Sequence, residues 1–379
     1  MNKIILQFMN INMNYDKKLN VLFVQDSSPC IRTNKLATAL NSNGMNIHIA
    51  HRGRTPDEVY GYGNKSFKSL RMLPKFKFME IGFIRNIIKQ ESIDLLHFHN
   101  QPDRLGAKMI EANFGIPVVY DQYDFMSFKH KLSATDRKYE RICNENADAT
   151  IYITESYKNE VGKHYKLIEN SICFANYFPS ANTLQKADFL PKLSAKDGNI
   201  HIAYLGRISE GKDDQKNVIE FLKVLSEKGF IVHVYPSRNK EYRKYKEIPN
   251  LEMHKNLPYG ELIIELSQYD YGGMILNDTY EDILPHLQYS LANKIFDYIC
   301  AGIPVLVQDI LTESRDLVVN NGFGLLIDDA THENLPKGED YNNLVEKIIA
   351  GRYEFSTEHQ IKRVLDFYYR TLELYYAKT

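Results

Sequence analysis

Two cations and a glycine follow an apolar run in the middle of the chain. Residues 200–205 read IHIAYL, and they lead into Gly206 and Arg207, with Lys212 five residues further on. Open α/β sheets bind ligands at the carboxyl ends of their strands, so cations at this position favour an anionic ligand. A lone arginine and lysine in a loop are usually only solvated, and the interpretation therefore depends on a second motif.

The second motif is the segment 293–307, which reads NKIFDYICAGIPVLV. Its spacing predicts an amphipathic helix that begins at Asn293, ends at Gly302 and leads into an apolar strand. The N-terminus of a helix offers unpaired backbone N–H groups, so this helix and the two cations together make a seat for a diphosphate. Lys294, in the first turn, is either a phosphate contact or an exposed lysine. The Asp297 carboxylate can accept hydrogen bonds from ribose hydroxyls.

These two motifs, in this order, resemble the nucleotide-sugar half of GT-B glycosyltransferases, most closely the retaining family 4. The resemblance covers nearly the whole chain and is strongest from residue 200 to residue 326. It implies that the donor is bound by six residues: Gly206, Arg207, Lys212, Asn293, Lys294 and Asp297. It also implies that Arg207 and Lys212 are catalytic, because they stabilise the departing diphosphate. Retention in the family is ascribed to same-face attack, so no dedicated nucleophile is expected.

One part of the family pattern is missing. Family 4 enzymes often carry two glutamates eight residues apart, whereas this chain has Asp297 at the second position and Tyr289 at the first. The residue that contacts the donor sugar is therefore left open. Glu281 and Asp282 precede the helix, and a solvated loop is the simpler interpretation of both.

Two histidines end an earlier apolar run, in the sequence LLHFH at residues 95–99. Side chains two residues apart on a strand share a face, so His97 and His99 point the same way. A metal site needs a third ligand, and none is spaced nearby in the sequence, so we predict no metal. The family resemblance instead makes His99 a catalytic substrate contact. By the same resemblance, Asp121 and Asp124 are expected to bind the acceptor or order a loop.

Short apolar runs alternate with helical patterns through most of the chain, which predicts parallel β-α-β units. The predicted fold class is α/β, with two Rossmann-like domains of parallel strands that face a central cleft. A linker rich in Pro, Ser, Asn and Lys covers 179–198. We expect an acceptor domain over 1–190, a nucleotide-sugar domain over 199–355, and a C-terminal helix over 356–379 that crosses back to the first domain. The predicted strands cover 20–25, 47–50, 95–98, 118–120, 150–153, 200–205, 232–235, 251–254, 273–276, 305–307 and 324–327.

Composition excludes several classes of protein. A chain of 379 residues is longer than a single-domain protein usually is, so two domains are expected. The four cysteines are scattered and form no Cys-x-x-Cys, which argues against a zinc ribbon and against a disulfide framework. No apolar run reaches the roughly 20 residues of a membrane span, and the N-terminus lacks a signal-peptide pattern. A cytoplasmic protein is expected. The absence of Asp-x-Asp disfavours a metal-dependent glycosyltransferase, and no dinucleotide or P-loop fingerprint occurs.

Charge is divided unevenly. Residues 1–195 carry 26 lysines and arginines against 19 acids, whereas the rest carries 21 against 29. Within the first part, 65–89 interleaves basic with apolar residues. Such a segment favours an anionic bilayer surface or nucleic-acid phosphates, and a core helix with a solvated lysine face has the same composition.

We therefore expect a metal-independent, retaining glycosyltransferase without a cofactor, which takes a UDP- or GDP-linked sugar as donor and works in glycan or polysaccharide assembly. The expected acceptor is a lipid-linked glycan at the inner membrane face. Modified DNA is the second choice, and the oligomeric state is open. Three alternatives stay open: a glycosyltransferase for modified nucleic acid, an enzyme like the UDP-sugar 2-epimerases, and a non-catalytic GT-B subunit.

Overall fold

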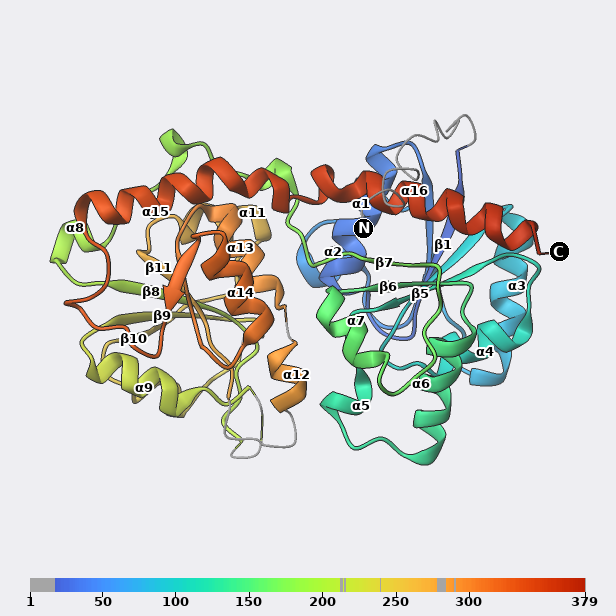
Figure 1. Ribbon diagram of the computed structural model, residues 1–379, viewed down its shortest axis with the longest axis horizontal. Coiled ribbons are helices and arrows are strands. Elements are labelled where there is room, and N and C mark those ends of the chain that lie inside the picture. The colour runs from blue at the N-terminus through green and yellow to red at the C-terminus, as the bar shows by residue number, and fades with distance from the viewer. Residues whose placement is uncertain are drawn as a thin grey trace, which may run out of the picture.

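The computed structural model describes residues 18–211, 214, 216–238, 240–277, 284–289 and 291–378. Two parallel β-sheets lie next to each other along the long axis of the molecule, and helices pack around both (Figure 1). The first sheet has seven strands in the order β3-β2-β1-β4-β5-β6-β7, and the second has six in the order β10-β9-β8-β11-β12-β13. The predicted fold class, two Rossmann-like parallel sheets, is confirmed.

The first half of the chain forms the seven-stranded sheet. Its strands are β1 (Asn20–Gln25), β2 (Asn46–His51), β3 (Ser69–Met72), β4 (Leu95–His99), β5 (Val118–Gln122), β6 (Ala149–Tyr152) and β7 (Ser171–Cys173). The helices between them are α1 (Ile31–Ser42), α2 (Pro56–Tyr60), α3 (Glu80–Gln90), α4 (Arg104–Ala112), α5 (Met126–Lys129), α6 (Ala134–Asn146) and α7 (Glu155–Val161).

The second half forms the six-stranded sheet. Its strands are β8 (His201–Gly206), β9 (Ile231–Pro236), β10 (Leu251–Met253), β11 (Tyr271–Met274), β12 (Val305–Val307) and β13 (Gly324–Leu326). Its helices are α8 (Ser194–Asp197), α9 (Ile219–Glu227), α10 (Arg243–Lys246), α11 (Tyr259–Leu266), α12 (Leu284–Gln288), α13 (Asn293–Ala301), α14 (Thr312–Asn320) and α15 (Gly338–Gly351). The last helix of the chain is α16 (Thr357–Tyr376).

The strands are apolar throughout because helices cover both faces of each sheet. Strand β1 shows this clearly, since Val21, Leu22, Phe23 and Val24 have no exposed surface. Alternate side chains enter opposite layers: Phe23 packs with one core cluster of the first sheet and Leu22 with the other. Because both faces are buried, the strand appears in the sequence as a continuous apolar run, which is why it could be predicted.

Strand order reverses between β1 and β4 in the first sheet and between β8 and β11 in the second. Ligands bind doubly wound sheets outside the carboxyl ends of the strands at such a reversal. Gly206 ends β8 at the second reversal and His99 ends β4 at the first. The architecture thus puts both sequence motifs where such ligands bind.

Helix α16 leaves the second half of the chain and packs on the first (Figure 1, red). Its Ile361, Val364, Phe367 and Tyr368 belong to a core cluster of the first sheet, together with Val21 and Phe23. At the crossing, Phe178 and Ser356 form a parallel β-bridge, so the two connections between the halves lie side by side.

Candidate nucleotide-sugar site

The position of α13 is fixed by one buried tyrosine. The Tyr298 hydroxyl accepts a hydrogen bond from Leu205 N at 3.0 Å and lies 3.1 Å from Ala203 O and 3.2 Å from Gly273 O. The ladder between β8 and β11 pairs Ile202 with Tyr271 and Ala203 with Gly272 and goes no further. Beyond that point the hydroxyl takes the place of the ladder bonds, and it holds α13 against the carboxyl ends of both strands.

Lys294, on the first turn of α13, lies beside the end of β8. Its Nζ is 4.0 Å from the centre of the Tyr204 ring and donates to Ile275 O at 3.4 Å. Gly206 has a positive φ of 127°, and a Cβ there would lie 3.7 Å from Lys294 Cε. Gly206 and Lys294 are therefore brought together, as the donor site requires.

Lys216 lies near this ammonium, and Arg207 lies near Lys216 in turn. Burial holds the pKa of Lys294 well below its ordinary value, and the nearby charge of Lys216 lowers it further. The pKa of Lys216 is itself lowered by burial and by the charges of Lys129 and Arg207. Within the described part of the chain, neither Arg207 nor Lys294 forms an ion pair with a carboxylate. We call Arg207, Lys216 and Lys294 the donor cations.

The sequence predicted a different lysine for this cluster. Lys212 lies outside the described residues, so its predicted contact with the diphosphate stays a prediction. Sequence reasoning missed Lys216, which lies just before α9, whereas Lys212 is followed in the sequence by two aspartates. The sequence feature that could have pointed to Lys216 is its position just before the apolar pattern of α9.

Asp297 and Asn293 share the face of α13 that looks toward α1 of the first half. Asp297 Oδ1 accepts a hydrogen bond from the Tyr259 hydroxyl at 2.9 Å and lies 3.5 Å from Lys35 Nζ. Lys35 Nζ also donates to Asn293 Oδ1 at 3.5 Å. The second Asp297 oxygen forms no hydrogen bond with the described residues and remains able to accept one from a ribose hydroxyl.

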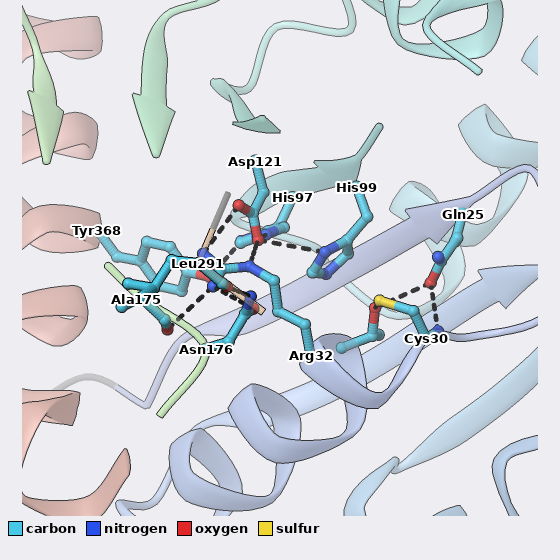
Figure 2. A network of polar contacts seen from close by, with 11 residues as sticks. Gln25, Cys30, Arg32, His97, His99, Asp121, Ala175, Asn176, Leu291 and Tyr368 are labelled. Atoms are coloured by element: carbon cyan, nitrogen blue, oxygen red, sulfur yellow. Dashed lines mark hydrogen bonds and ion pairs between the residues drawn. The ribbon is translucent and has the colours of Figure 1, made fainter. Parts of the chain in front are cut away.

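A buried polar network lies under the carboxyl ends of β4 and β5 (Figure 2). The Arg32 guanidinium donates to both oxygens of Asp121, at 2.9 and 3.0 Å. His97 Nε2 lies 3.4 Å from Asp121 Oδ2, and its Nδ1 pairs with the Tyr368 hydroxyl of α16. Burial alone would raise the pKa of Asp121, but Arg32 and the two imidazoles hold it well below the usual range. Asp121 is therefore a structural anion inside the first half.

The predicted contact residue His99 belongs to this network. Its side chain is fully buried, and Nδ1 lies 3.2 Å from Asp121 Oδ2. Burial lowers the pKa of His99, so the ring is neutral near pH 7. Both ring nitrogens are buried without a hydrogen bond to the described residues, although Nδ1 lies within ion-pair distance of Asp121. If the hydrogen of the neutral ring is on Nδ1, facing that carboxylate, Nε2 is a free acceptor.

The structure separates the two predicted aspartates of the acceptor region. Both carboxylate oxygens of Asp121 are bonded within the network above. Asp124 instead accepts a hydrogen bond from Lys129 at 2.9 Å, and its negative charge raises the pKa of Lys216. His286 of α12 lies near the same pair, and burial lowers its pKa to about 4. Asp124, Lys129 and His286 thus form the wall beside the donor cations.

Contacts join the two halves around this site. Asn176 Nδ2 donates to Leu291 O at 3.0 Å, and Asn176 Oδ1 accepts from Arg32 at 3.3 Å (Figure 2). Tyr289, which stands where family 4 often has its first glutamate, donates to Glu160 of α7 at 3.0 Å. The entry to α13 is therefore tied to the first sheet on both sides.

The basic and apolar stretch 65–89 divides into two parts. Helix α3 is a core helix, with Ile84 and Ile87 buried and Lys89 exposed. Before it, the tip at 75–79 projects Phe76, Phe78 and Met79, whose exposed fractions are 60%, 82% and 49%, beside two exposed lysines. The two phenyl rings lie 5.8 Å apart. Among the described residues, no helix combines the length and apolar character needed to cross a bilayer.

The arrangement of two facing parallel sheets defines a GT-B protein, and solved structures agree. The chain aligns with a glycosyltransferase from Rickettsia africae at TM-score 0.63 and 14% identity, over 94% of this chain and 99% of that one. It aligns with HepE from Anabaena, solved in complex with UDP-glucose, at TM-score 0.62 and 13% identity, over 95% and 100%. Sucrose-phosphate synthase from Thermosynechococcus elongatus aligns at 0.58 and 12%, over 96% and 100%. At these identities the likeness establishes the fold.

A family model adds the sequence relationship. Residues 32–173 match the model of Glycosyltransferase Family 4, so the predicted resemblance to this family is confirmed, over that part of the chain. No curated protein sequence matches the chain significantly. The fold and the family match together support a glycosyltransferase.

Proposed function

We propose that this protein transfers a sugar from a nucleoside-diphosphate sugar to an acceptor, with retention at the anomeric carbon. The observation that carries the proposal is the convergence of the donor cations beside the start of α13, with the free oxygen of Asp297 one turn further along the same helix. A diphosphate suits the three cations, and a ribose suits the carboxylate. The complex of HepE with UDP-glucose supports a uridine nucleotide as the first donor to test.

The chemistry in this proposal is electrostatic. As the bond from the anomeric carbon to the diphosphate breaks, negative charge grows on the leaving phosphate, and Arg207, Lys216 and Lys294 stabilise it. Lys294 and Lys216 lie near each other before the donor binds, and that mutual repulsion is relieved by the anion. The protein's own cations then serve where other glycosyltransferases use a metal ion, so we propose transfer without one.

His99 has a defined role in this proposal. Its Nε2 accepts a hydrogen bond from a hydroxyl of the donor sugar, and the Asp121 carboxylate, 3.2 Å from Nδ1, favours the tautomer in which Nε2 is the acceptor. A buried nitrogen without a partner is unusual, and a substrate hydroxyl accounts for it.

We propose further that the acceptor is lipid-linked and reached at an anionic membrane surface. The tip at 75–79 exposes the phenyl rings of Phe76 and Phe78 and the side chain of Met79, and it carries two lysines, Lys75 and Lys77. Aromatic side chains enter the interfacial layer of a bilayer, and lysines next to them meet anionic headgroups. The residue that follows the tip, Glu80 at the start of α3, is buried and forms ion pairs with both Arg52 and Arg104.

A donor screen tests the transferase proposal. Nucleoside-diphosphate sugars with uracil or guanine bases are first ranked by thermal shift and then incubated with the protein and lipid extracts, with products followed by nuclear magnetic resonance. A glycosylated acceptor with the donor's anomeric configuration is expected, with or without EDTA. Free sugar formed without an acceptor would indicate an epimerase-like enzyme. Donor binding without turnover would indicate a non-catalytic subunit.

A flotation assay tests the membrane proposal. Wild type is expected to float with vesicles rich in anionic lipid. The variant Phe76→Ser/Phe78→Ser is expected to remain in the bottom fraction, without vesicles. A matched control, Lys138→Ser, removes an exposed cation from α6 away from the tip. Gel shift on duplex DNA with the same proteins completes the test, because binding to DNA alone would make modified nucleic acid the better acceptor.

A further inference from the structure

A second polar cluster lies in the second half of the chain, on strands that hold none of the donor residues except the end of β8. His201 begins β8, His233 lies within β9, and Glu252 and His254 lie in and just after β10, the edge strand of the sheet (Figure 1). Glu252 is paired in register with His233, and His254 follows two residues later, so all of these side chains share one face.

The spacing of three donor atoms in this cluster matches a metal site. His233 Nδ1 lies 3.0 Å from His254 Nε2 and 3.4 Å from Glu252 Oε2, and the last two atoms are 3.9 Å apart. Ligands bound to zinc at about 2.1 Å in a tetrahedron are separated by about 3.4 Å. The three atoms therefore form a triangle close to one face of such a tetrahedron.

A chain of hydrogen bonds behind His233 fixes its tautomer. Asp197 can only accept, so His201 Nε2, 3.2 Å from both carboxylate oxygens, carries a hydrogen. In the tautomer that carries its hydrogen on Nε2, His201 accepts at Nδ1 a hydrogen bond from His233 Nε2, 2.8 Å away. A lone pair is then left on His233 Nδ1, the atom that faces Glu252 and His254. Second-shell carboxylates orient metal-binding histidines in this way.

The rings are also held by packing. Tyr235 stacks on His254 at 4.5 Å with an interplanar angle of 9°, and Tyr269 lies 4.5 Å from His233. The hydroxyls of these two tyrosines bond to each other, and Tyr235 donates to Glu265. His233 is 2% exposed, His254 27% and Glu252 59%, so the site is closed on the sheet side and open to solvent for a water ligand.

The other cluster of similar composition shows the contrast. His97, His99 and Asp121 also bring their donor atoms close together, but the Arg32 guanidinium occupies both Asp121 oxygens. A cation there would meet a fixed positive charge, and its carboxylate ligand is already used. Glu252 has no such competitor among the described residues.

We propose that His233, Glu252 and His254 bind a divalent first-row metal ion, Zn²⁺ above all, with water in the fourth position. Two neutral imidazoles and one carboxylate are a favourable ligand set for zinc. On binding, the Nε2 of His254 gives up its hydrogen bond to His233 and donates a lone pair instead, as its hydrogen moves to Nδ1. The ion joins the three-residue edge strand β10 to β9, and it takes no part in the transfer chemistry.

Zinc titration of the chelator-stripped protein tests this site. We expect one Zn²⁺ per chain in competition with a chromophoric zinc indicator, confirmed by elemental analysis after gel filtration, and a rise in melting temperature on zinc addition. His254→Ala and Glu252→Gln should each weaken binding by at least roughly tenfold and abolish the rise. His359→Ala and Glu247→Gln, which remove an exposed imidazole and an exposed carboxylate elsewhere, should bind like wild type.

Two outcomes would decide against the site. Binding unchanged in Glu252→Gln, or weakened equally in the two control variants, would overturn the proposal. If circular dichroism shows that His254→Ala is misfolded, Glu252→Gln decides alone, because its carboxylate is largely exposed and its loss leaves the fold intact.

Discussion

Lys35 Nζ on α1 and Asp297 Oδ1 on α13 lie 3.5 Å apart, although the two helices belong to different halves of the chain. The same oxygen accepts the Tyr259 hydroxyl, and the Lys35 ammonium lies 5.5 Å from the centre of the Tyr259 ring. The three side chains fix the carboxylate with one oxygen used and one free. The first half of the chain thus shapes a group that was predicted to act within the second half alone.

Asp297→Ala should weaken binding of the donor nucleotide by at least roughly tenfold, because the carboxylate that accepts the ribose hydroxyls is lost. Asp297→Glu should retain most of the affinity, since the longer carboxylate still reaches the ribose. Isothermal titration with UDP and GDP measures both. Glu261→Gln, an exposed acid on α11, is the control. Equal affinities for all variants would make Asp297 a structural partner of Lys35 and nothing more.

Lys216→Ala should lower kcat/KM by roughly 10²-fold, as expected when one charge that stabilises the leaving group is removed. Arg207→Ala should show a similar loss. Lys223→Ala, on the exposed side of α9, should behave like wild type. Lys212→Ala decides whether Lys212 or Lys216 contacts the diphosphate. If Lys212→Ala has near-normal turnover and Lys216→Ala does not, the contact belongs to Lys216. Normal turnover in Lys216→Ala would contradict the donor-cation cluster.

Tyr298→Phe should destabilise the protein by about 1–3 kcal/mol, because Leu205 N–H and the carbonyls of Ala203 and Gly273 are left buried without their partner. Urea denaturation followed by circular dichroism measures the change. Tyr353→Phe, at an exposed ring, controls for loss of a hydroxyl. Donor affinity should fall as well, since α13 loses the contact that sets its position. A stability equal to that of wild type would mean that water replaces the hydroxyl.

Stability should fall as pH drops from about 6.5 toward 4, in part through His97. Burial and the neighbouring His99 lower the pKa of His97 to about 4 from 6.5. Between these values the unfolded chain takes up a proton that the folded chain refuses, so acid favours unfolding in this window. His97→Gln should be less stable at pH 7 but show a shallower loss toward pH 5. The free energy of unfolding is measured by urea denaturation at each pH for both proteins. If it falls equally steeply with pH in wild type and in His97→Gln, the buried imidazole is not neutral in the folded protein.

The sequence predicted the strands wherever burial on both faces made the run continuous. The segments 20–25 and 305–307 were predicted with the bounds of β1 and β12, and the other predicted strands differ from the observed ones by one or a few residues. Strands β3 and β7 were missed. Strand β3 is a half-exposed edge strand with an arginine in it, and β7, the other edge strand, reads Ser-Ile-Cys and is only partly buried, so neither produces an apolar run.

Only part of the candidate site could be predicted from the sequence, because only some of its residues lie in local motifs. Gly206 and Lys294 were found because each belongs to a motif within one strand or helix. Lys35 was missed because its contact with Asp297 depends on how the two halves face each other, which no local pattern encodes. His99 was found as a residue, but its burial beside Asp121 and Arg32 follows from β4, β5 and α1 meeting at one point.

The two connections between the halves are hydrogen-bonded to each other. Phe178 N donates to Phe355 O at 3.3 Å, and Thr357 N donates to Phe178 O at 2.7 Å, so a short parallel ribbon carries both crossings. The hydrogen bonds hold the two crossings together, so the halves are joined by one paired connection and not by two independent strands of chain. If the halves move apart, we expect both crossings to flex together at this pair, and the contact between Lys35 and Asp297 is the one to follow.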